Sequence, residues 1–287
     1  MSITPRRAAV LAALAAITLT GCGAPTDDAS SSPAAGEDQC SKDNLTLVTD
    51  GTLTIGTDKP AYPPWFVDDE PSNGKGYESA VAYAIADEMG FAKDEVTWAV
   101  VPFNKAVAPG KKDFDFDINQ VSINDKRKKA VDFSSGYYTV AQAVVTTKGS
   151  KVASATSLAD LKGAKLGAQV GTTSYDAIGE QIKPTVEASV FDTNDVAVQA
   201  LKNDQVDALV VDLPTAFYMT AAQLDDGVIV GQLLSTGSEP EEFGAVLDKG
   251  SALTPCVSAA VDALRDNGTL DELAEEWLAN KGAPELK

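Results

Sequence analysis

The sequence of 287 residues contains no histidine, only three cysteines, and far fewer basic than acidic residues. Without histidine, catalysis by Ser-His-Asp or Cys-His, histidine-ligated zinc and imidazole pH switches are all excluded. Three cysteines are too few for a zinc site of four thiolates, so we expect no metal site of this kind. With 23 Lys and Arg against 42 Asp and Glu, the net charge of -19 disfavours nucleic acid as a partner. Hydrophobic residues make up 44%, which is typical of a folded globular protein.

The N-terminus has the features of a secretory leader. Arg6 and Arg7 precede an apolar run from Ala8 to Leu19, which has the length of a signal-peptide core and is too short to span a bilayer comfortably. Leu19-Thr20-Gly21-Cys22 then resembles the lipobox of bacterial lipoproteins, in which the cysteine is lipidated; an ordinary signal peptide with a chance cysteine is the alternative. We therefore expect residues 1–21 to be removed and Cys22 to carry acyl chains such as palmitate, which anchor the protein on the extracytoplasmic face of the cell membrane.

Two features follow the predicted lipidation site. Residues 22–43 are predicted to form a flexible tether, because Gly23 to Asp38 is rich in Ala, Ser, Pro, Gly and Asp and has no apolar period. Cys40 and Cys256 remain near opposite ends of the folded region. Outside the cytosol such cysteines most simply pair, so we predict a disulfide bond, with two buried free thiols as the alternative.

From Leu45 onward, short apolar strands alternate with amphipathic helices. Strands are predicted at 53–56, 96–101, 114–117, 142–147, 165–170, 189–191, 208–211, 228–230 and 243–247, and longer helices at 77–91, 195–203 and 254–266. Ser157 with Asp160 predicts a capping box for a short helix, and Thr269 with Glu272 predicts another for the last helix. The alternation predicts α/β layers with mainly parallel strands.

Three local motifs allow two interpretations each. In Asp113-x-Asp115-x-Asp117 the spacing is that of a calcium loop, but Ile118 replaces the required glycine, so a strand with one solvated face explains it better. The turn Gly171-Thr172-Thr173 offers backbone N–H groups to an anion, although many strand-to-helix turns look the same. The segment Tyr62-Pro63-Pro64-Trp65 is too rich in proline for a strand interior, and it suits a pocket wall about as well as a core edge.

Several segments, taken together and in order, resemble the bacterial extracellular solute-binding proteins of family 3, the polar-amino-acid receptors of ABC importers. The resemblance covers nearly everything from residue 45 to the end. It is carried by Gly56-Thr57-Asp58, Tyr62-Pro63-Pro64-Trp65-Phe66, Lys75-Gly76-Tyr77-Glu78, the stretch from Ser122 to Ser134, Val170-Gly171-Thr172-Thr173, Gln205 to Asp212, and Asp266-Asn267-Gly268-Thr269-Leu270.

The resemblance implies the type II periplasmic-binding-protein fold, in which two α/β lobes are joined by two crossover strands with a ligand cleft between them. By motif, lobe one would hold residues 44–141 and 236–287, and lobe two would hold residues 142–235. The crossovers would lie near Ala141-Gln142 and Ser235-Thr236.

The resemblance also implies roles for individual residues. Arg127 would bind the α-carboxylate of the ligand, because a planar guanidinium matches a carboxylate with two parallel hydrogen bonds. The turn residues Thr172 and Thr173 would bind the same group, while Asp212, Ser122 and the carbonyl of Gln120 would bind the α-ammonium. The positions that would line the side-chain pocket are Asp58, Tyr62, Phe103 and Gln169.

We therefore expect the substrate-binding protein of an ABC transporter, which captures a small polar amino acid by lobe closure, without a cofactor, and delivers it to a membrane permease. We expect it to act as a monomer that contacts the membrane only through its lipid. The alternatives are an enzyme on the same fold, such as a dehydratase of small acids, and an amino-acid sensor without transport. Departures from the family pattern fall on Lys59-Pro60-Ala61, the long stretch 102–116 and Asn119-Gln120-Val121, which leaves the identity of the amino acid open.

Overall fold

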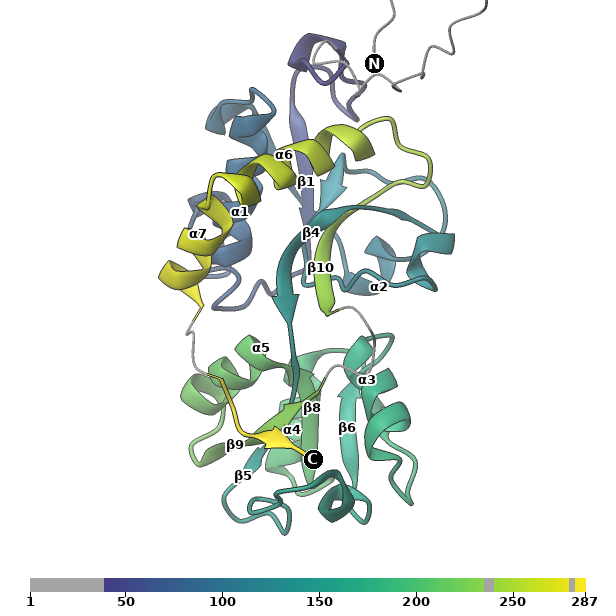
Figure 1. Ribbon diagram of the computed structural model, residues 1–287, viewed down its shortest axis with the longest axis vertical. Coiled ribbons are helices and arrows are strands. Elements are labelled where there is room, and N and C mark those ends of the chain that lie inside the picture. Colours follow the sequence, from purple (N-terminus) through teal and green to yellow (C-terminus); the bar gives the residue numbers. More distant parts are fainter. Residues whose placement is uncertain (1–38, 235–239, 279–281) are drawn as a thin grey trace, which may run out of the picture. The chain divides into compact units, whose positions relative to one another are not determined.

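The computed structural model describes residues 39–234, 240–278 and 282–287 (Figure 1). The predicted signal peptide, Cys22, most of the predicted tether and the predicted crossover at Ser235-Thr236 lie outside the described residues. The α-helices are α1 (Tyr77–Glu88), α2 (Phe103–Ala106), α3 (Thr173–Ala177), α4 (Asn194–Lys202), α5 (Leu213–Tyr218), α6 (Thr254–Asp266) and α7 (Thr269–Trp277). Single helical turns include η1 (Lys42–Asn44), η2 (Pro71–Asn73), η3 (Lys93–Glu95), η4 (Arg127–Lys129), η5 (Leu158–Leu161), η6 (Ile178–Ile182) and η7 (Met219–Gln223).

The first sheet has five strands in the order β2-β1-β3-β10-β4. Its strands are β1 (Leu53–Thr57), β2 (Val96–Val100), β3 (Phe116–Asp117), β4 (Asp132–Val140) and β10 (Glu241–Leu247). β1 pairs in parallel with β2 and β3, whereas β10 pairs antiparallel with β3 and β4. Helices α1, α6 and α7 cover one face of this sheet, and α2 packs against Val246 and its neighbours on the other.

The second sheet has six strands in the order β11-β9-β5-β8-β6-β7. Its strands are β5 (Gln142–Thr147), β6 (Leu166–Gln169), β7 (Ser189–Phe191), β8 (Ala208–Asp212), β9 (Gly227–Leu233) and β11 (Glu285–Leu286). Val144 and Val210 point to the face covered by α3, while Val145 and Leu209 point to the face covered by α4 and α5. Because both faces are covered, β8 is apolar from Ala208 to Val211, as expected of a buried strand.

The chain passes between the two sheets at Ala141, which alone separates β4 from β5. It returns after β9, so that β10 belongs to the first sheet again. The C-terminus then departs from the predicted boundaries, which place 236–287 in lobe one. β11 pairs in parallel with β9 of the second sheet, and Leu286 is buried in that sheet's core.

The sequence predicts a strand at 114–117 with one face exposed to solvent, and this exposure is wrong. β3 comprises only Phe116 and Asp117, and Asp115 and Asp117 are just 4% and 0% exposed. The reason is the position of β3 between β1 and β10, where helices cover both faces. Asp115 accepts the backbone N–H groups of Val48 and Thr54 at 2.8 and 2.7 Å, so its carboxylate is a structural acceptor inside the protein.

The predicted arrangement of mainly parallel strands is confirmed for the described residues. Each sheet is mixed, because β10 in the first sheet and β5 in the second run antiparallel to both of their neighbours, while the other strands of each sheet share one direction. Another prediction of local structure is wrong. The capping box at Thr269 and Glu272 does not form. Gly268, in the left-handed conformation with φ +84°, precedes α7, and the Thr269 N–H is bound by Asn267 Oδ1 at 3.0 Å. The box at Ser157 and Asp160 is confirmed at the start of η5.

The predicted disulfide bond between Cys40 and Cys256 is present, with the two Cα atoms 5.2 Å apart. It links the segment before η1 to the third residue of α6, beside the core of the first sheet. The residues joined are 216 apart in the sequence, so the bond closes nearly the whole folded region into one loop.

Candidate functional site

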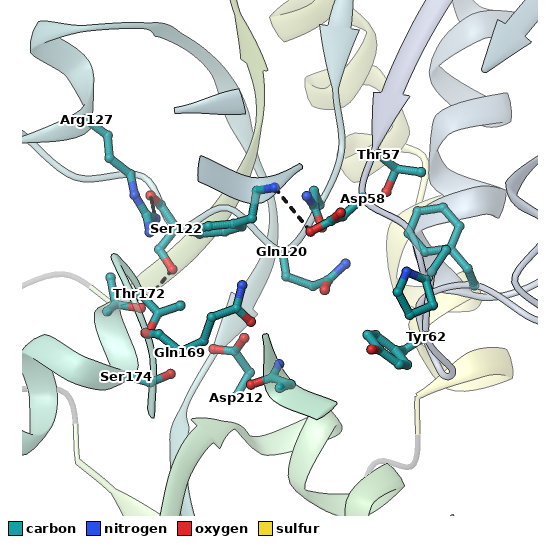
Figure 2. A pocket seen from close by; sticks show the side chains of 17 residues that line it. Thr57, Asp58, Tyr62, Gln120, Ser122, Arg127, Gln169, Thr172, Ser174 and Asp212 are labelled. Carbon is teal, nitrogen blue, oxygen red and sulfur yellow. Dashed lines mark hydrogen bonds between the residues drawn. The ribbon is translucent and has the colours of Figure 1, made fainter. Parts of the chain in front are cut away.

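A pocket with a cavity volume of about 60 Å³ lies where residues of both sheets meet (Figure 2). Its lining includes every residue for which the sequence predicts a role in ligand binding, namely Asp58, Tyr62, Phe103, Gln120, Ser122, Arg127, Gln169, Thr172, Thr173 and Asp212. Their individual roles stay predictions. The lining also includes residues that the sequence analysis did not select, namely Thr57, Pro60, Ala61, Phe66, Asn119, Ser174 and Asn194.

The sheets bring these side chains together because several parallel strands end at the pocket. Thr57 is the last residue of β1, Gln169 the last of β6 and Asp212 the last of β8. Residues that follow the carboxyl ends of parallel strands are the usual binding positions of open α/β sheets. In Figure 2, Arg127 lies toward one end of the pocket, and Asp58 and Tyr62 lie toward the other.

Arg127 supplies the positive charge of the pocket from η4, and only 7% of it is exposed. Its guanidinium donates to the carbonyl oxygens of Ser122 at 2.7 Å and Gly171 at 3.0 Å, and it stacks over the Phe103 ring at 5.3 Å. Burial lowers the pKa of Arg127, and the nearby carboxylates of Asp212 and Glu241 oppose that shift. A guanidinium carries five N–H donors, so others remain for an anion in the pocket.

Asp212 faces the pocket from the second sheet. Its Oδ1 accepts a hydrogen bond from Gln142 Nε2 at 2.8 Å, which fixes the orientation of the carboxylate. Burial raises the pKa of Asp212 to about 7, and repulsion by Glu241 adds to the effect. A cation close to Asp212 would therefore strongly favour its ionised form.

Hydrogen bonds join residues packed with the first sheet to residues packed with the second sheet. Ser122 Oγ and Thr173 Oγ1 are 3.2 Å apart, and Arg127 reaches Gly171 across the same gap. Trp65 Nε1 also donates to Thr215 Oγ1 at 3.2 Å. Three pairs of residues, each with one member from either lobe, are therefore within hydrogen-bond distance.

Glu241, the first residue of β10, is the main residue that the sequence analysis missed here. It accepts hydrogen bonds from Ser122 Oγ and Thr173 Oγ1, both at 2.6 Å. The resemblance assigns the Thr173 hydroxyl to the ligand carboxylate, whereas in the structure its proton is donated to Glu241. The available signal was the acidic pair Glu241-Glu242, which lies between the predicted crossover at Ser235-Thr236 and the strand predicted at 243–247.

Gln120 is held beside the pocket by a second buried acid. Its backbone has φ +49°, in the left-handed region, which is uncommon for a residue other than glycine. Glu78, which is fully buried on α1, accepts the Gln120 N–H at 2.7 Å, and also bonds to the Gln120 amide group and the Tyr137 hydroxyl. Burial raises the pKa of Glu78 to about 7, against the opposing effect of these hydrogen bonds.

The end of the pocket away from Arg127 is polar. Asp58 accepts the backbone N–H groups of Lys59 at 2.7 Å and Phe103 at 3.1 Å, and carboxylate lone pairs remain. The side-chain nitrogen of Asn119 is buried and has no hydrogen-bond partner within the described part of the chain. Tyr62 packs against the Tyr218 ring, with centroids 6.4 Å apart. This end offers a carboxylate, amide groups and an aromatic wall.

Two features are absent from the described residues. None of their helices is long and apolar enough to cross a membrane. They also contain no group of three or more histidine, cysteine, aspartate or glutamate side chains placed to hold a metal ion.

Two curated proteins are similar to this chain over most of their length. The chain is 29% identical to the L-cystine-binding protein TcyJ of Escherichia coli (strain K12), over 79% of this chain and 82% of that protein. It is also 29% identical to the ABC transporter glutamine-binding protein GlnH of Bacillus subtilis (strain 168), over 94% of this chain and 95% of that protein. Both relatives are amino-acid-binding proteins.

Solved structures show the same architecture. An ancestral arginine-binding protein bound to arginine has a TM-score of 0.66 and 34% identity, with coverage of 80% of this chain and 99% of that one. The ancestral amino acid-binding protein AncCDT-1, described as a precursor of cyclohexadienyl dehydratase, has a TM-score of 0.65 and 30% identity, with coverage of 80% and 96%. The predicted type II periplasmic-binding-protein fold is therefore confirmed. Residues 53–280 match the family model, and the chain belongs to the bacterial extracellular solute-binding proteins, family 3.

Proposed function

We propose that the protein is the lipid-anchored receptor of an ABC importer, which captures an L-amino acid with a polar side chain and presents it to a membrane permease. Cys22 would hold it on the extracytoplasmic face of the membrane, and it would act as a monomer. The names of its relatives support an amino-acid ligand, since the similar proteins bind cystine, glutamine and arginine.

The observation that carries the proposal is the pairing of Arg127 with Asp212 on one pocket. An α-amino acid has a carboxylate and an ammonium group on the same carbon atom, so it can meet both side chains at once. Arg127 precedes β4 of the first sheet, and Asp212 ends β8 of the second. A zwitterion bound to both would therefore hold the two lobes together, and would favour the closed state through contacts that only that state provides.

The remainder of the pocket supports a polar side chain on the ligand. Asp58 accepts positive groups or N–H donors, and Asn119 and Gln169 add amide groups to the pocket lining. Tyr62 gives an aromatic surface for an aliphatic stem or a planar group. These groups suit a guanidinium, an ammonium or a carboxamide better than an aliphatic side chain.

The test is a thermal-shift screen of the domain beginning at residue 39 against the standard L-amino acids and cystine, followed by calorimetry. A ligand at 100 times its Kd should add about 2.7 kcal/mol to the free energy of unfolding. L-Arginine and L-citrulline form a matched pair of similar shape, which separates recognition of charge from recognition of an amide. Stabilisation by none of these compounds would contradict the proposal, and uptake assays in a strain lacking the protein would test the role in transport.

A dehydratase activity is the second candidate, because AncCDT-1 is described as a precursor of such an enzyme. The raised pKa of Asp212 gives a pocket carboxyl group that would hold a proton near neutral pH, as a general acid does. We favour the receptor, in which the same carboxyl group binds an ammonium ion. Product analysis after incubation with small hydroxy acids distinguishes the two, since a receptor leaves them unchanged.

A further inference from the structure

The carboxylate of Glu241 lies at the centre of a hydrogen-bond network beside the pocket. Its Oε1 accepts from Ser122 Oγ and Thr173 Oγ1 at 2.6 Å each, and both of its oxygens lie 3.3 Å from Gln142 Nε2. Gln142 Nε2 also donates to Asp212 at 2.8 Å. One glutamate is thus connected to three of the residues with predicted roles in ligand binding.

Glu241 stands behind the pocket wall and does not imitate a bound ligand. The residues that line the pocket include Ser122, Thr173 and Asp212, and Glu241 is not among them. Within the described part of the chain, Arg127 forms no ion pair with any carboxylate, and its two hydrogen bonds go to backbone carbonyls. A carboxylate that occupied the place of the ligand would be expected to pair with this guanidinium.

The network fixes the direction in which the hydroxyl groups of Ser122 and Thr173 donate their protons. A serine or threonine hydroxyl has one proton and two lone pairs. Since the protons of Ser122 and Thr173 go to the charged oxygen of Glu241, only lone pairs are left for the pocket. The hydroxyl groups of Ser122 and Thr173 can then only accept hydrogen bonds from a ligand, as can the carboxylate of Asp212. These three side chains are referred to as one wall of the pocket.

We propose that Glu241 is a positioning residue of the ligand pocket, which fixes the hydroxyl groups of Ser122 and Thr173 as hydrogen-bond acceptors and so makes this wall selective for a positively charged amino group. The inference rests on the proposed function, because it assigns the ammonium group of an amino acid to this wall. It adds a residue whose own side chain does not touch the ligand.

The proposal has an electrostatic consequence for Asp212. The charged and titratable groups that act on Asp212 are Glu241 on β10, Arg127 on η4, Glu78 on α1 and Tyr138 on β4. Of the side chains that raise the pKa of Asp212, Glu241 has the largest effect after burial itself. An amino group must bind the ionised form of Asp212, so affinity should fall by up to about tenfold for each pH unit below that pKa. Removing the charge of Glu241 should weaken this dependence on pH.

The experiment compares wild type, Glu241→Gln and Glu242→Gln. Glu242 is a matched control, since it is the next residue of β10, loses the same charge and lies beside Gly136 on the opposite face. Each protein is titrated calorimetrically at about pH 6 and about pH 8 with L-arginine, L-glutamine and whichever standard amino acid wild type binds most tightly. NMR of the Asp212 carboxyl carbon, without ligand, follows its ionisation in the same three proteins.

We expect Glu241→Gln to bind about fivefold to tenfold more weakly than wild type at the higher pH, with a smaller difference at the lower pH. We also expect the Asp212 titration to move to lower pH in Glu241→Gln, and neither property to change in Glu242→Gln. Tighter binding by Glu241→Gln would identify Glu241 as a competitor of the ligand and overturn the proposal. An equal loss at both pH values with an unmoved Asp212 titration would also overturn it, because that is the result of a purely structural role. Binding of no amino acid by wild type would contradict the proposed function, and the ligand-free titration would still show whether Glu241 acts on Asp212.

Discussion

Replacing Asp212 with asparagine should stabilise the ligand-free protein at neutral and alkaline pH while it abolishes ligand binding. The side chain is positioned by a hydrogen bond from Gln142 Nε2 at 2.8 Å, and the oxygen of an asparagine can accept the same bond. Burial, with repulsion by Glu241, raises the pKa of Asp212 from 3.8 to about 7. The native fold therefore carries the cost of an ionised Asp212 whenever the pH is above this value.

The sign and size of the effect follow from the shift in pKa. A carboxyl group whose pKa is raised by folding stabilises the native state below its unfolded pKa, and this stabilisation is lost as the pH rises through the folded pKa. A shift of roughly three pKa units corresponds to a loss on the order of 4 kcal/mol, and relaxation of the pocket would reduce it. We therefore expect Asp212→Asn to raise the free energy of unfolding by about 2–4 kcal/mol at pH values above about 8.

Urea unfolding of the ligand-free protein at about pH 5 and about pH 8 measures this effect. Asp225→Asn is the control, because Asp225 is exposed in the same lobe and loses the same charge. The advantage of Asp212→Asn over wild type should be largest at the higher pH and should shrink at the lower one. Loss of stability in Asp212→Asn at both pH values, or a gain that does not vary with pH, would refute the reasoning.

Three other predictions concern charge, covalent linkage and anchoring. Arg127→Ala should weaken amino-acid binding by about 2–5 kcal/mol, because it leaves the ligand carboxylate unpaired; calorimetry with the exposed neighbour Lys128→Ala as control measures this, and near-wild-type affinity would contradict it. Replacing both Cys40 and Cys256 by serine should lower the free energy of unfolding by up to about 5 kcal/mol, since the bond joins residues 216 apart, and should lower Tm by about 10–20 °C; an unchanged Tm in calorimetric scans would show that the bond adds nothing. Cys22→Ser should release the protein from the membrane fraction or leave it unprocessed, which fractionation and mass spectrometry of the N-terminus would detect; a processed, membrane-bound variant would exclude lipidation at this residue.

The sequence was informative wherever local pattern and burial agree. The strand Ser189–Phe191 was predicted with its observed bounds, and the strand Gln142–Thr147 likewise, because each is short, β-rich and bounded by turn residues. The helix that begins at Thr254 was recognised from proline in its first turn and from Asn267-Gly268 at its end. Such signals depend only on neighbouring residues.

What the sequence did not reveal depends on contacts between distant segments. β4 was missed because half of its residues are polar or glycine, and it exists as a strand through its pairing with β10. Asp115 and Asp117 were expected to be exposed to solvent, since nothing in the local sequence indicates that helices cover both faces of the sheet at β3. β11 has two residues and no pattern of its own, and its partner β9 lies some 50 residues away.

The site divides in the same way. Ten of the residues that line the pocket were found through the resemblance to the family. Glu78 and Glu241 were not, because neither lines the pocket and each acts on a lining residue through hydrogen bonds that appear only in three dimensions. Glu78 lies in a segment that carries the family resemblance, but neither that segment nor the sequence around Glu241 shows which pocket residue each glutamate contacts.

The acids in and behind the pocket explain why binding and stability should be coupled. Asp212 and Glu78 both have pKa values raised to about 7, and Glu241 adds a further carboxylate, against the single guanidinium of Arg127 among the described lining residues. An amino group entering the pocket offsets the repulsion among these carboxylates, which Arg127 alone opposes with a positive charge among the described lining residues. The free energy gained is larger in the closed arrangement, where the groups are shielded from water. The same interaction that recognises the ligand therefore also stabilises the closed, folded state, and a protein made more stable by neutralising these acids is expected to bind less well.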